Sequence, residues 1–182
     1  NGCKPEDINA GLEDVIEIWN LVFIQYNRDQ NGDLHALPHK HVDTGMGLER
    51  VVRAMSGKKS NYETDLFIPI INSICSITGK KYEGELIPVM NAIADHIRAL
   101  TFAISDGAMP SNEGRGYVLR RILRRALRLA RKLEFNEPFM YRLVDAVIEV
   151  FGDTFPEIIE KIEYIKNVIM GEEISFNITL DK

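Results

Sequence analysis

Residues 17–50 read EIWNLVFIQYNRDQNGDLHALPHKHVDTGMGLER. The first part, Glu17 to Arg28, is a nearly continuous run of apolar, β-branched and aromatic residues, which predicts a buried strand. Residues 29–33 follow, and their Asn-Gly pair is a strong hairpin signal because both residues tolerate positive φ. Leu34 to Val42 is then predicted to return as an antiparallel strand, with Pro38 indicating an edge or an irregularity.

The pattern becomes helical after this hairpin. A short helix beginning after Thr44 is predicted to end at Gly57, and a second, Asp65 to Thr78, is predicted to end at Gly79. Residues 79–88 are rich in turn formers and indicate a linker. The helices predicted beyond the linker cover residues 89–105, 116–133, 138–151 and 156–180. The predicted fold class is therefore α+β, an antiparallel strand pair followed by an all-helical half.

Composition indicates a globular protein with a local basic region. The chain has 182 residues, of which 45% are hydrophobic and 27% charged, enough for one or two small domains. The net charge of −5 is unevenly distributed: residues 115–133 hold eight of the 22 Lys and Arg and no acid, which leaves 14 bases against 27 acids elsewhere. This pattern indicates a local anionic partner and excludes a surface that is positive throughout.

The two cysteines and the chain ends indicate the setting of the protein. Cys3 and Cys75 are too few for a disulfide framework or a zinc pattern, so we expect a reducing compartment, the cytoplasm. No apolar run approaches the roughly 20 residues of a membrane span. The first residues are not a signal peptide, and the last ones still have a helical pattern. We therefore expect a fragment of a longer protein.

Asp43 to Arg50 joins a strand end to a helix start. Gly45 and Gly47 allow a ligand to approach the backbone closely, and free amides at a helix start suit an anion. The planar fork of Arg50 can bind phosphate oxygens, and Asp43 can hold an ammonium group. Gly-x-Gly alone is a weak signal. From spacing alone, the alternative is a capped helix start with two turn glycines and a surface arginine.

A second constellation lies on the helix predicted over residues 116–133. At 100° per residue its basic side chains fall within about 140° of arc, and apolar side chains occupy the other side. The basic residues are Arg120, Arg121, Arg124, Arg125, Arg128, Arg131 and Lys132. This predicts a basic stripe headed by Arg115 and the loop 111–114, which suits an RNA backbone. The alternative is a solvated face paired with the acids of neighbouring helices.

The segment Asp43 to Arg50 resembles the third signature motif of class II aminoacyl-tRNA synthetases, Gly-x-Gly-x-Glu-Arg in a strand–helix element. Nearly the whole chain is similar to the alanyl-tRNA synthetases of this class. The matching segments are residues 17–23, 37–38, 43–50, 60–67, 94–98 and 109–121. The resemblance implies that residues 1–84 are the C-terminal part of the catalytic domain. It implies that residues 85–182 belong to a truncated helical domain that recognises the tRNA acceptor stem.

The resemblance also implies the reaction, which is ATP-dependent activation of alanine, assisted by Mg²⁺, followed by transfer to the tRNA 3′ end. Arg50 would be the catalytic residue and contact the γ-phosphate of ATP. Gly45 and Gly47 would line the floor under the adenosine and the alanine. The first two class II motifs would lie upstream, so the chain alone is expected to be inactive. The alternative is a non-catalytic RNA-binding or scaffold fragment that retains the fold.

The alanine pocket implied by the resemblance is small. Asp43 would bind the α-ammonium group, Asn20 would be a second polar contact, and Val22 would close the side-chain pocket beside Gly45. Such a pocket discriminates weakly, because one methylene is worth only about 1–3 kcal/mol and an added hydroxyl about 100-fold. The family's zinc-containing editing domain, which would supply the missing selectivity, lies outside this chain.

On the helical half, the resemblance implies contacts with the acceptor stem. Asn112 matches a residue implicated in reading the wobble pair that identifies the alanine tRNA, and Arg124 matches a position tied to the same recognition. The other expected tRNA-binding residues are Arg115, Arg120, Arg121, Arg125 and Arg128.

Three further features are interpreted without a functional role. Histidines 35, 39 and 41 would share a strand face only if Pro38 left the strand regular, so we expect no metal site there. Trp19 is expected in the core. The acidic last third, residues 134–182, is expected to present solvated helix faces.

Overall fold

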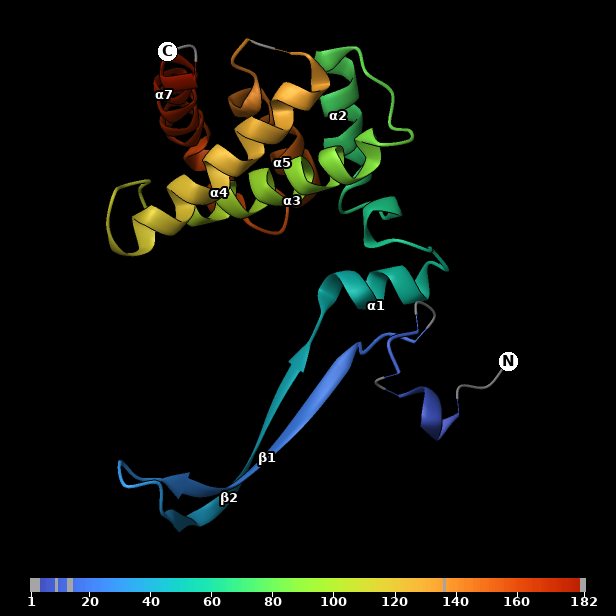
Figure 1. Cartoon of the computed structure of the whole chain (residues 1–182), viewed down its shortest axis with the longest axis vertical. Helices are drawn as coiled ribbons and strands as arrows, with labels where there is room; N and C mark the ends of the chain where they lie inside the picture. The colour runs from blue at the N-terminus through green and yellow to red at the C-terminus, as the bar shows by residue number, and fades with distance from the viewer. Residues whose placement is uncertain (1–3, 9, 13–14, 136, 181–182) are drawn as a thin grey trace. The chain divides into compact units, whose positions relative to one another are not determined.

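The computed structural model describes residues 4–8, 10–12, 15–135 and 137–180. Cys3 lies outside the described residues. The fold is α+β, as predicted, with a two-stranded antiparallel sheet and a set of helices (Figure 1). The chain divides into two compact units, Asn1–Thr64 and Asp65–Lys182. The first unit contains the sheet and one α-helix, and the second is helical.

The sheet is the predicted hairpin of β1 (Trp19–Arg28) and β2 (Leu34–Met46). Its turn is held by the Asp29 carboxylate, which accepts a hydrogen bond from the Asp33 backbone N–H at 3.0 Å. Gly32 has a φ of 94°, a left-handed conformation that glycine adopts without strain. The hairpin turn predicted from the Asn-Gly pair is therefore confirmed.

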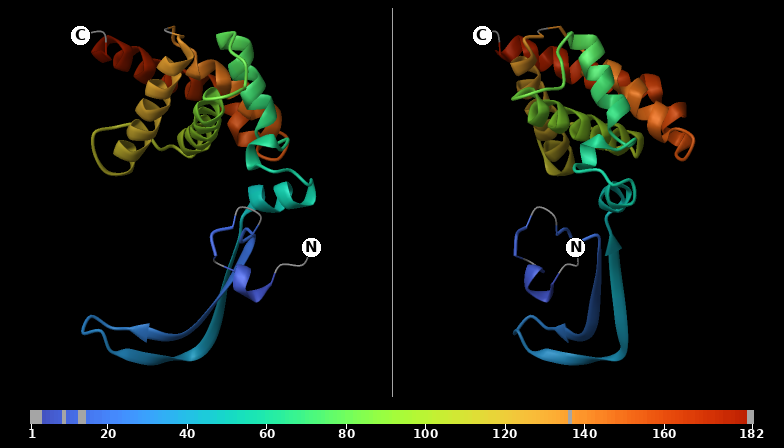
Figure 2. Two further views of the ribbon diagram at one scale, coloured as in Figure 1. Left: turned by 45° about the vertical axis from the view of Figure 1, so that its right-hand side comes forward. Right: turned by 90° about the vertical axis from the view of Figure 1, so that its right-hand side faces the viewer.

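An irregularity interrupts the ribbon at Pro38. The pairing register shifts between Ile24 and Tyr26, opposite the part of β2 that contains Pro38, and the ribbon bends along its length (Figure 2). A proline cannot donate to the ladder, so the prediction of an irregularity here is confirmed. The shift also interrupts the alternation between His35 and His41. In the described part of the chain, no group of three or more His, Cys, Asp or Glu side chains could hold a metal ion.

The strands are far more exposed than their sequence predicts. Every residue of β1 is exposed, and Trp19 is 59% exposed. The predictions of a buried strand and of a core tryptophan are therefore wrong for the described residues. The physical reason is that a sheet needs a second layer to bury a face, and the described hairpin has only its two strands.

The helical elements follow the predicted order. The α-helices are α1 (Leu48–Met55), α2 (Ile68–Thr78), α3 (Leu86–Ser105), α4 (Gly114–Ala130), α5 (Val144–Phe151), α6 (Pro156–Glu160) and α7 (Ile162–Leu180). The short 3₁₀ turns are η1 (Pro5–Asp7), η2 (Asn61–Glu63), η3 (Arg131–Leu133) and η4 (Met140–Leu143). Gly79 ends α2 in the left-handed conformation, with φ 69°, as predicted. None of the described helices is long and apolar enough to cross a membrane.

Two predicted helices are interrupted. The segment 138–151 begins as the 3₁₀ turn η4 before α5, and the segment 156–180 is divided at Lys161. The ammonium group of Lys161 donates to the carbonyl of Ser105 at 2.6 Å. This contact satisfies a carbonyl at the C-terminal end of α3, where a cation is favourable.

The core of the second unit lies where α2, α3, α4, α5 and α7 meet (Figures 1 and 2). Fully buried core side chains include Ile74, Ile93, Ile97, Leu123 and Ile169. Because α2 packs against α3 and α5, it belongs to the helical compact unit, whereas the sequence places a functional boundary after it, at residues 84–85. That functional boundary stays a prediction.

Glu173 on α7 is buried, against the expectation that the acids of the last third are solvated. Its side chain is 1% exposed and accepts hydrogen bonds from the backbone N–H groups of Phe139 at 3.0 Å and Met140 at 3.1 Å. These amides begin η4 and would otherwise lack an acceptor. Burial raises the pKa of Glu173 to about 7, although the backbone hydrogen bonds act in the opposite direction.

Glu173→Gln is expected to change how stability depends on pH. The folded pKa of about 7 lies above the unfolded value of 4.5, so the contribution of Glu173 is fully present below pH 4.5 and is lost as pH rises through 7. Between pH 5 and 8 the wild-type free energy of unfolding should therefore fall by about 2–3 kcal/mol relative to the Gln variant. Urea unfolding across this range measures the difference. Glu163→Gln, an exposed position on α7, is the control, and parallel profiles for Glu173→Gln and wild type would contradict the assignment.

Candidate functional site

The glycine-containing segment joins β2 to α1. The Gly47 N–H donates to the Ile18 carbonyl at 3.1 Å, and the Gly47 carbonyl accepts from the Val51 N–H at 3.0 Å. Gly47 therefore ends the ribbon and begins the helix. The strand continues to Met46, beyond its predicted end at Val42, because cross-strand pairing persists along this segment. Gly47 has no side chain to cap the first turn, which leaves the amides of that turn suited to an anion.

One face of the hairpin carries the four residues predicted to bind alanine. Asn20 lies opposite Gly45, and Val22 lies opposite Asp43. Directly opposed residues of an antiparallel pair share a face, and so do residues two apart on one strand. A Cβ added at Gly45 would meet the Asn20 amide oxygen at 3.9 Å, an ordinary contact, so the surface above Gly45 is open. The register therefore sets these four residues on one face.

The opposite face of the hairpin is apolar. The indole N–H of Trp19 donates to the Thr44 hydroxyl, which donates to the Asn20 carbonyl at 3.2 Å. The apolar side chains beside this pair, between 57% and 69% exposed, are Leu21, Phe23, Val42 and Met46. The two faces therefore differ in chemistry. One is polar and lined by the predicted alanine-binding residues, and the other is hydrophobic.

Arg50 and Asp43 make local contacts within the first unit. The Arg50 guanidinium donates through Nη1 to the Glu17 carbonyl at 2.7 Å, so the side chain turns back toward the start of β1. The Asp43 carboxylate accepts through Oδ1 from the Thr44 N–H at 2.8 Å. Both side chains belong to exposed residues. Asp43 thus has its second carboxylate oxygen available for a cationic group.

A hollow lies beside the start of β1. Its volume is about 600 Å³, and the residues before the strand that line it include Ile8, Gly11, Val15 and Ile16. Asn20 and Trp19 are among its lining residues, together with Glu17. One polar side chain of the predicted alanine site therefore also borders this hollow.

The loop between α3 and α4 packs closely on the first turn of α4. A Cβ added at Gly116 would lie 2.3 Å from the Met109 carbonyl oxygen and 2.2 Å from the Ser111 hydroxyl oxygen. The Ser111 N–H donates to the Gly116 carbonyl at 3.0 Å. Only glycine allows this approach, so Gly116 determines where the loop carries Asn112.

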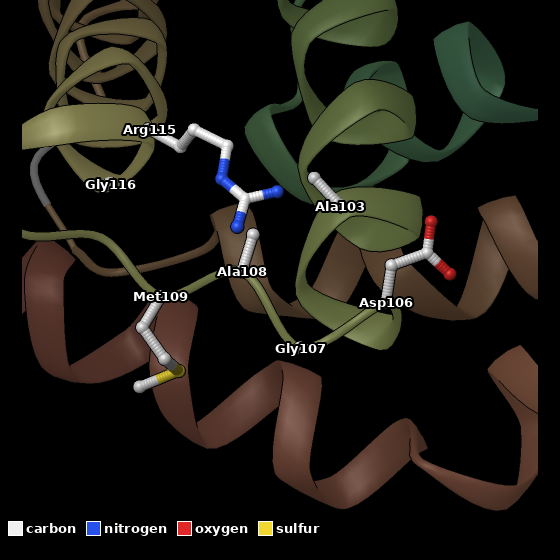
Figure 3. A pocket seen from close by; sticks show the side chains of 7 residues that line it. All are labelled: Ala103, Asp106, Gly107, Ala108, Met109, Arg115 and Gly116. Carbon is white, nitrogen blue, oxygen red and sulfur yellow. The ribbon is translucent and has the colours of Figure 1, made fainter.

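Arg115 lines a second hollow, formed by the end of α3 and the loop (Figure 3). The hollow has a volume of about 510 Å³, and the guanidinium of Arg115 points into it. Asp106 is the acidic residue on its lining, and the other lining residues are Ala103, Gly107, Ala108, Met109 and Gly116. Arg115 lies in the first turn of α4, which begins two residues before the predicted helix start at residue 116.

The basic side chains of α4 and η3 form two rows. Arg121, Arg125, Arg128 and Lys132 are exposed, whereas Arg120, Arg124 and Arg131 are half-buried. At 100° per residue the half-buried row covers about 0–40° of the predicted arc and the exposed row about 80–140°. The exposed stripe is therefore narrower than the sequence predicts.

The half-buried row faces α7. The Arg124 guanidinium carbon lies 5.3 Å from the centre of the Phe176 ring, a cation–π contact, and Arg131 donates to the Asn177 amide oxygen at 3.3 Å. Arg120 donates through Nε and Nη2 to the two carboxylate oxygens of Glu172, the first at 3.0 Å. These contacts match in part the alternative of arginines paired with acids of neighbouring helices.

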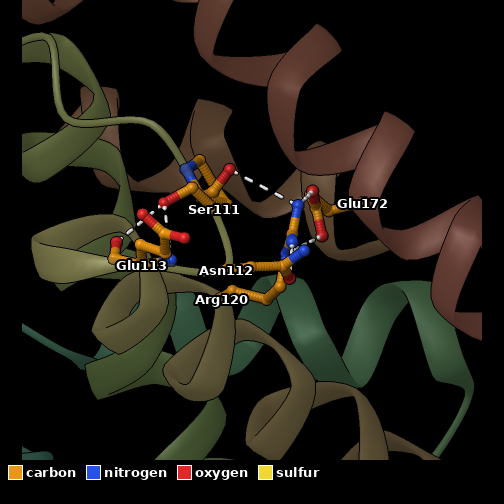
Figure 4. A network of polar contacts seen from close by, with 6 residues as sticks. Ser111, Asn112, Glu113, Arg120 and Glu172 are labelled. Carbon is orange, nitrogen blue, oxygen red and sulfur yellow. Dashed lines mark hydrogen bonds and ion pairs between the residues drawn. The ribbon is translucent and has the colours of Figure 1, made fainter.

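Arg120 also contacts the loop that precedes α4. Its Nη1 donates to the amide oxygen of Asn112, and its Nη2 reaches the Pro110 carbonyl at 3.5 Å (Figure 4). Glu172, Arg120 and Asn112 thus form one chain of polar contacts from α7 to the loop. Sequence analysis missed Glu172. The only available signal was its acidic character on a helix predicted to lie near an arginine-rich one.

The sequence is similar to known proteins over nearly all of its length. Residues 3–182 match the family described as tRNA synthetases class II (A). Alanine–tRNA ligase of Chlorobium chlorochromatii is 53% identical over the whole chain, and that of Chlorobium phaeobacteroides is 55% identical over the whole chain. Alanine–tRNA ligase of Bacillus cytotoxicus is 52% identical over 92% of the chain. The chain spans 21%, 21% and 19% of the lengths of these relatives. Since the family match covers nearly every residue, the chain belongs to the class II (A) tRNA synthetases.

Proposed function

We propose that the chain is a segment of an alanine–tRNA ligase that contributes part of the ATP and alanine site and part of the surface for the tRNA acceptor stem. The observation that carries the alanine site is the strand register, which sets Asn20 opposite Gly45 and Val22 opposite Asp43. In the complete ligase, the alanine carboxylate would attack the α-phosphorus of ATP and release pyrophosphate. The tRNA 3′ hydroxyl would then displace AMP.

The alanine pocket is proposed on the polar face of the hairpin. The free carboxylate oxygen of Asp43 would bind the ammonium group, and the Asn20 amide would make a second polar contact. Val22, opposite Asp43, would lie against the methyl group, and Gly45 leaves space for the ligand. A small amino acid offers one ammonium, one carboxylate and one methyl group, and this face has a partner for the first and the last.

Arg50 and the start of α1 are proposed to bind the phosphates. The guanidinium would exchange the Glu17 carbonyl for γ-phosphate oxygens, with Gly47 and the amides of the first helical turn beside it. Catalysis would then consist of positioning and charge stabilisation. Mg²⁺ would arrive with ATP and neutralise phosphate charge, since proteins usually hold it through substrate phosphates and one or two carboxylates.

The RNA surface is proposed on the exposed row of α4. Arg121, Arg125, Arg128 and Lys132 extend along roughly 16 Å of helix axis and would contact backbone phosphates. Asn112, in the loop before α4, would contribute base recognition. We place the ligase in the cytoplasm, where its tRNA substrate is used. The alternative, a non-catalytic RNA-binding or scaffold protein, predicts RNA binding without ATP–pyrophosphate exchange in the complete protein.

Arg50→Ala in the complete ligase is expected to slow alanine activation by roughly 100- to 1,000-fold, the usual loss for one preorganised charge-stabilising donor. ATP–pyrophosphate exchange measures this step. Arg53→Ala is the matched control, because Arg53 lies on the same helix and donates to the Lys58 carbonyl at 3.4 Å. A loss below about threefold in the Arg50 variant would show that Arg50 is not part of the ATP site.

Asp43→Ala is expected to weaken alanine binding by about 3 kcal/mol, because the ammonium group loses its charged partner. Val22→Ala should instead relax the pocket toward larger amino acids. Alanine-dependent exchange rates give KM and kcat for each variant. His41→Ala, two residues from Asp43 on the same strand, is the control. Unchanged alanine KM and kcat in the Asp43 variant would show that the pocket is misassigned.

Charge reversal of the exposed row tests RNA binding by the chain itself. The double variant Arg121→Glu/Arg125→Glu should lower affinity for every acceptor-stem hairpin alike, and the wild-type affinity should fall steeply with salt as phosphate contacts release counterions. Fluorescence anisotropy across a salt series measures both effects. Lys58→Glu/Lys59→Glu, on exposed residues of the first unit, makes the same charge change elsewhere. Equal binding by the Arg121/Arg125 variant and wild type would identify the row as a solvated face.

A further inference from the structure

We infer that Arg120 and Glu172 position the Asn112 side chain so that its NH₂ group, and not its carbonyl oxygen, is presented to RNA. The inference rests on the proposed function, since it assigns a role within the proposed acceptor-stem surface. It makes Arg120 and Glu172 positioning residues. The RNA partner of Asn112 would then be a hydrogen-bond acceptor on a base edge.

The contact with Arg120 fixes the polarity of the Asn112 amide. Arg120 has only hydrogen-bond donors, so the atom of Asn112 that it contacts must be the acceptor, Oδ1. The amide NH₂ group is therefore directed away from the guanidinium. An amide held in this way offers two donors and has its oxygen already engaged. Its NH₂ group can satisfy a base carbonyl oxygen or ring nitrogen, whereas its oxygen is directed at the guanidinium and not toward a base amino group.

Glu172 holds the Arg120 guanidinium in one orientation. A free arginine side chain has many rotamers, and a rotating guanidinium would leave the Asn112 amide free to flip. Glu172 binds the guanidinium through both carboxylate oxygens, with Nε at 3.0 Å from Oε2, and the side chains of Arg120 and Glu172 are each only 20% exposed. Such a fork-to-fork pair has a defined geometry as well as charge. Nη1 is then left pointing at the loop (Figure 4).

The backbone of the loop is held by contacts other than those that orient the Asn112 side chain. The loop backbone is fixed by the close approach at Gly116 and by the Ser111 hydroxyl, which donates to the Glu113 carbonyl at 2.9 Å. These contacts do not involve Arg120 or Glu172, and the contact that Arg120 makes with the loop backbone, from Nη2 to the Pro110 carbonyl, is long at 3.5 Å. Loss of the ion pair should therefore alter the orientation of the Asn112 amide while the loop stays in place.

The test uses the 182-residue chain and two acceptor-stem hairpins, one with a guanine–uracil wobble pair at the identity position and one with a standard pair. The measured quantity is a ratio of dissociation constants, that of the standard-pair hairpin divided by that of the wobble-pair hairpin. Glu172→Gln, which replaces one acceptor oxygen by a donor that Arg120 cannot use, should reduce this ratio about fivefold or more with little change for the standard stem. Asn112→Asp, which keeps an oxygen for Arg120 but loses the NH₂ donors, should abolish the preference. The double variant should equal Asn112→Asp alone.

A second measurement needs no RNA. In the free protein, the ¹⁵N–¹H signals of the Asn112 side-chain NH₂ should shift and lose order in Glu172→Gln, while the backbone amide of Ser111 should keep its signal. Glu163→Gln, on the exposed side of α7, should leave both unchanged.

The outcomes separate this inference from the proposed function. Failure of the wild type to bind either hairpin would contradict the proposed RNA surface. An unchanged signal of the Asn112 NH₂ group in Glu172→Gln would contradict the positioning role of Arg120 and Glu172, whatever the RNA-binding result. If Glu172→Gln weakened the binding of both hairpins equally, the ion pair would be only a structural contact between α4 and α7. Discrimination that survives in Asn112→Asp, or that is absent from wild type, would overturn the assigned donor role.

Discussion

Burial of the apolar side of α4 fixes the rotation of this helix about its axis, and the placement of every basic side chain on it follows. Leu119, Leu123 and Ala126 lie in the core, and α4 packs against α3 and α7. Once these residues are buried, the arginines nearest α7 can reach its acidic and aromatic side chains, and those farther around the helix remain in water. Hydrophobic packing therefore divides the seven basic side chains into a half-buried row and an exposed row, although their sequence pattern places them all in one stripe.

In the hairpin the corresponding constraint is the pairing register. A shift of one residue would move Asp43 to the face of Trp19 and leave the polar face without its carboxylate. The turn held by Asp29 and the irregularity at Pro38 therefore bear on the chemistry at the other end of the ribbon. The ribbon has one polar and one apolar face because successive residues of each strand point to opposite faces.

Local signals predicted most of the fold. The Asn-Gly turn, Pro38 and the glycine that ends α2 act through neighbouring backbone groups, so their effects are visible in sequence. The four candidate alanine-binding residues came from the resemblance to a known family, and the strand register sets them on one face. Exposure of β1 did not, because an apolar run does not reveal whether another layer covers it. The division of the arginine row and the burial of Glu173 depend on contacts between residues 33 to 52 positions apart, which no local pattern encodes.

Two adjacent acids on α7 have opposite surroundings: Glu172 meets a guanidinium at the edge of the helix pair, and Glu173 meets backbone amides inside the core. A turn of α7 about its own axis by one residue, about 100°, would carry both carboxylates away from their partners at once. Burying an unpaired carboxylate is expensive, so torsion of α7 is opposed from two sides. A motion of α7 that keeps both contacts must therefore move the helix as a body, without rotation about its axis.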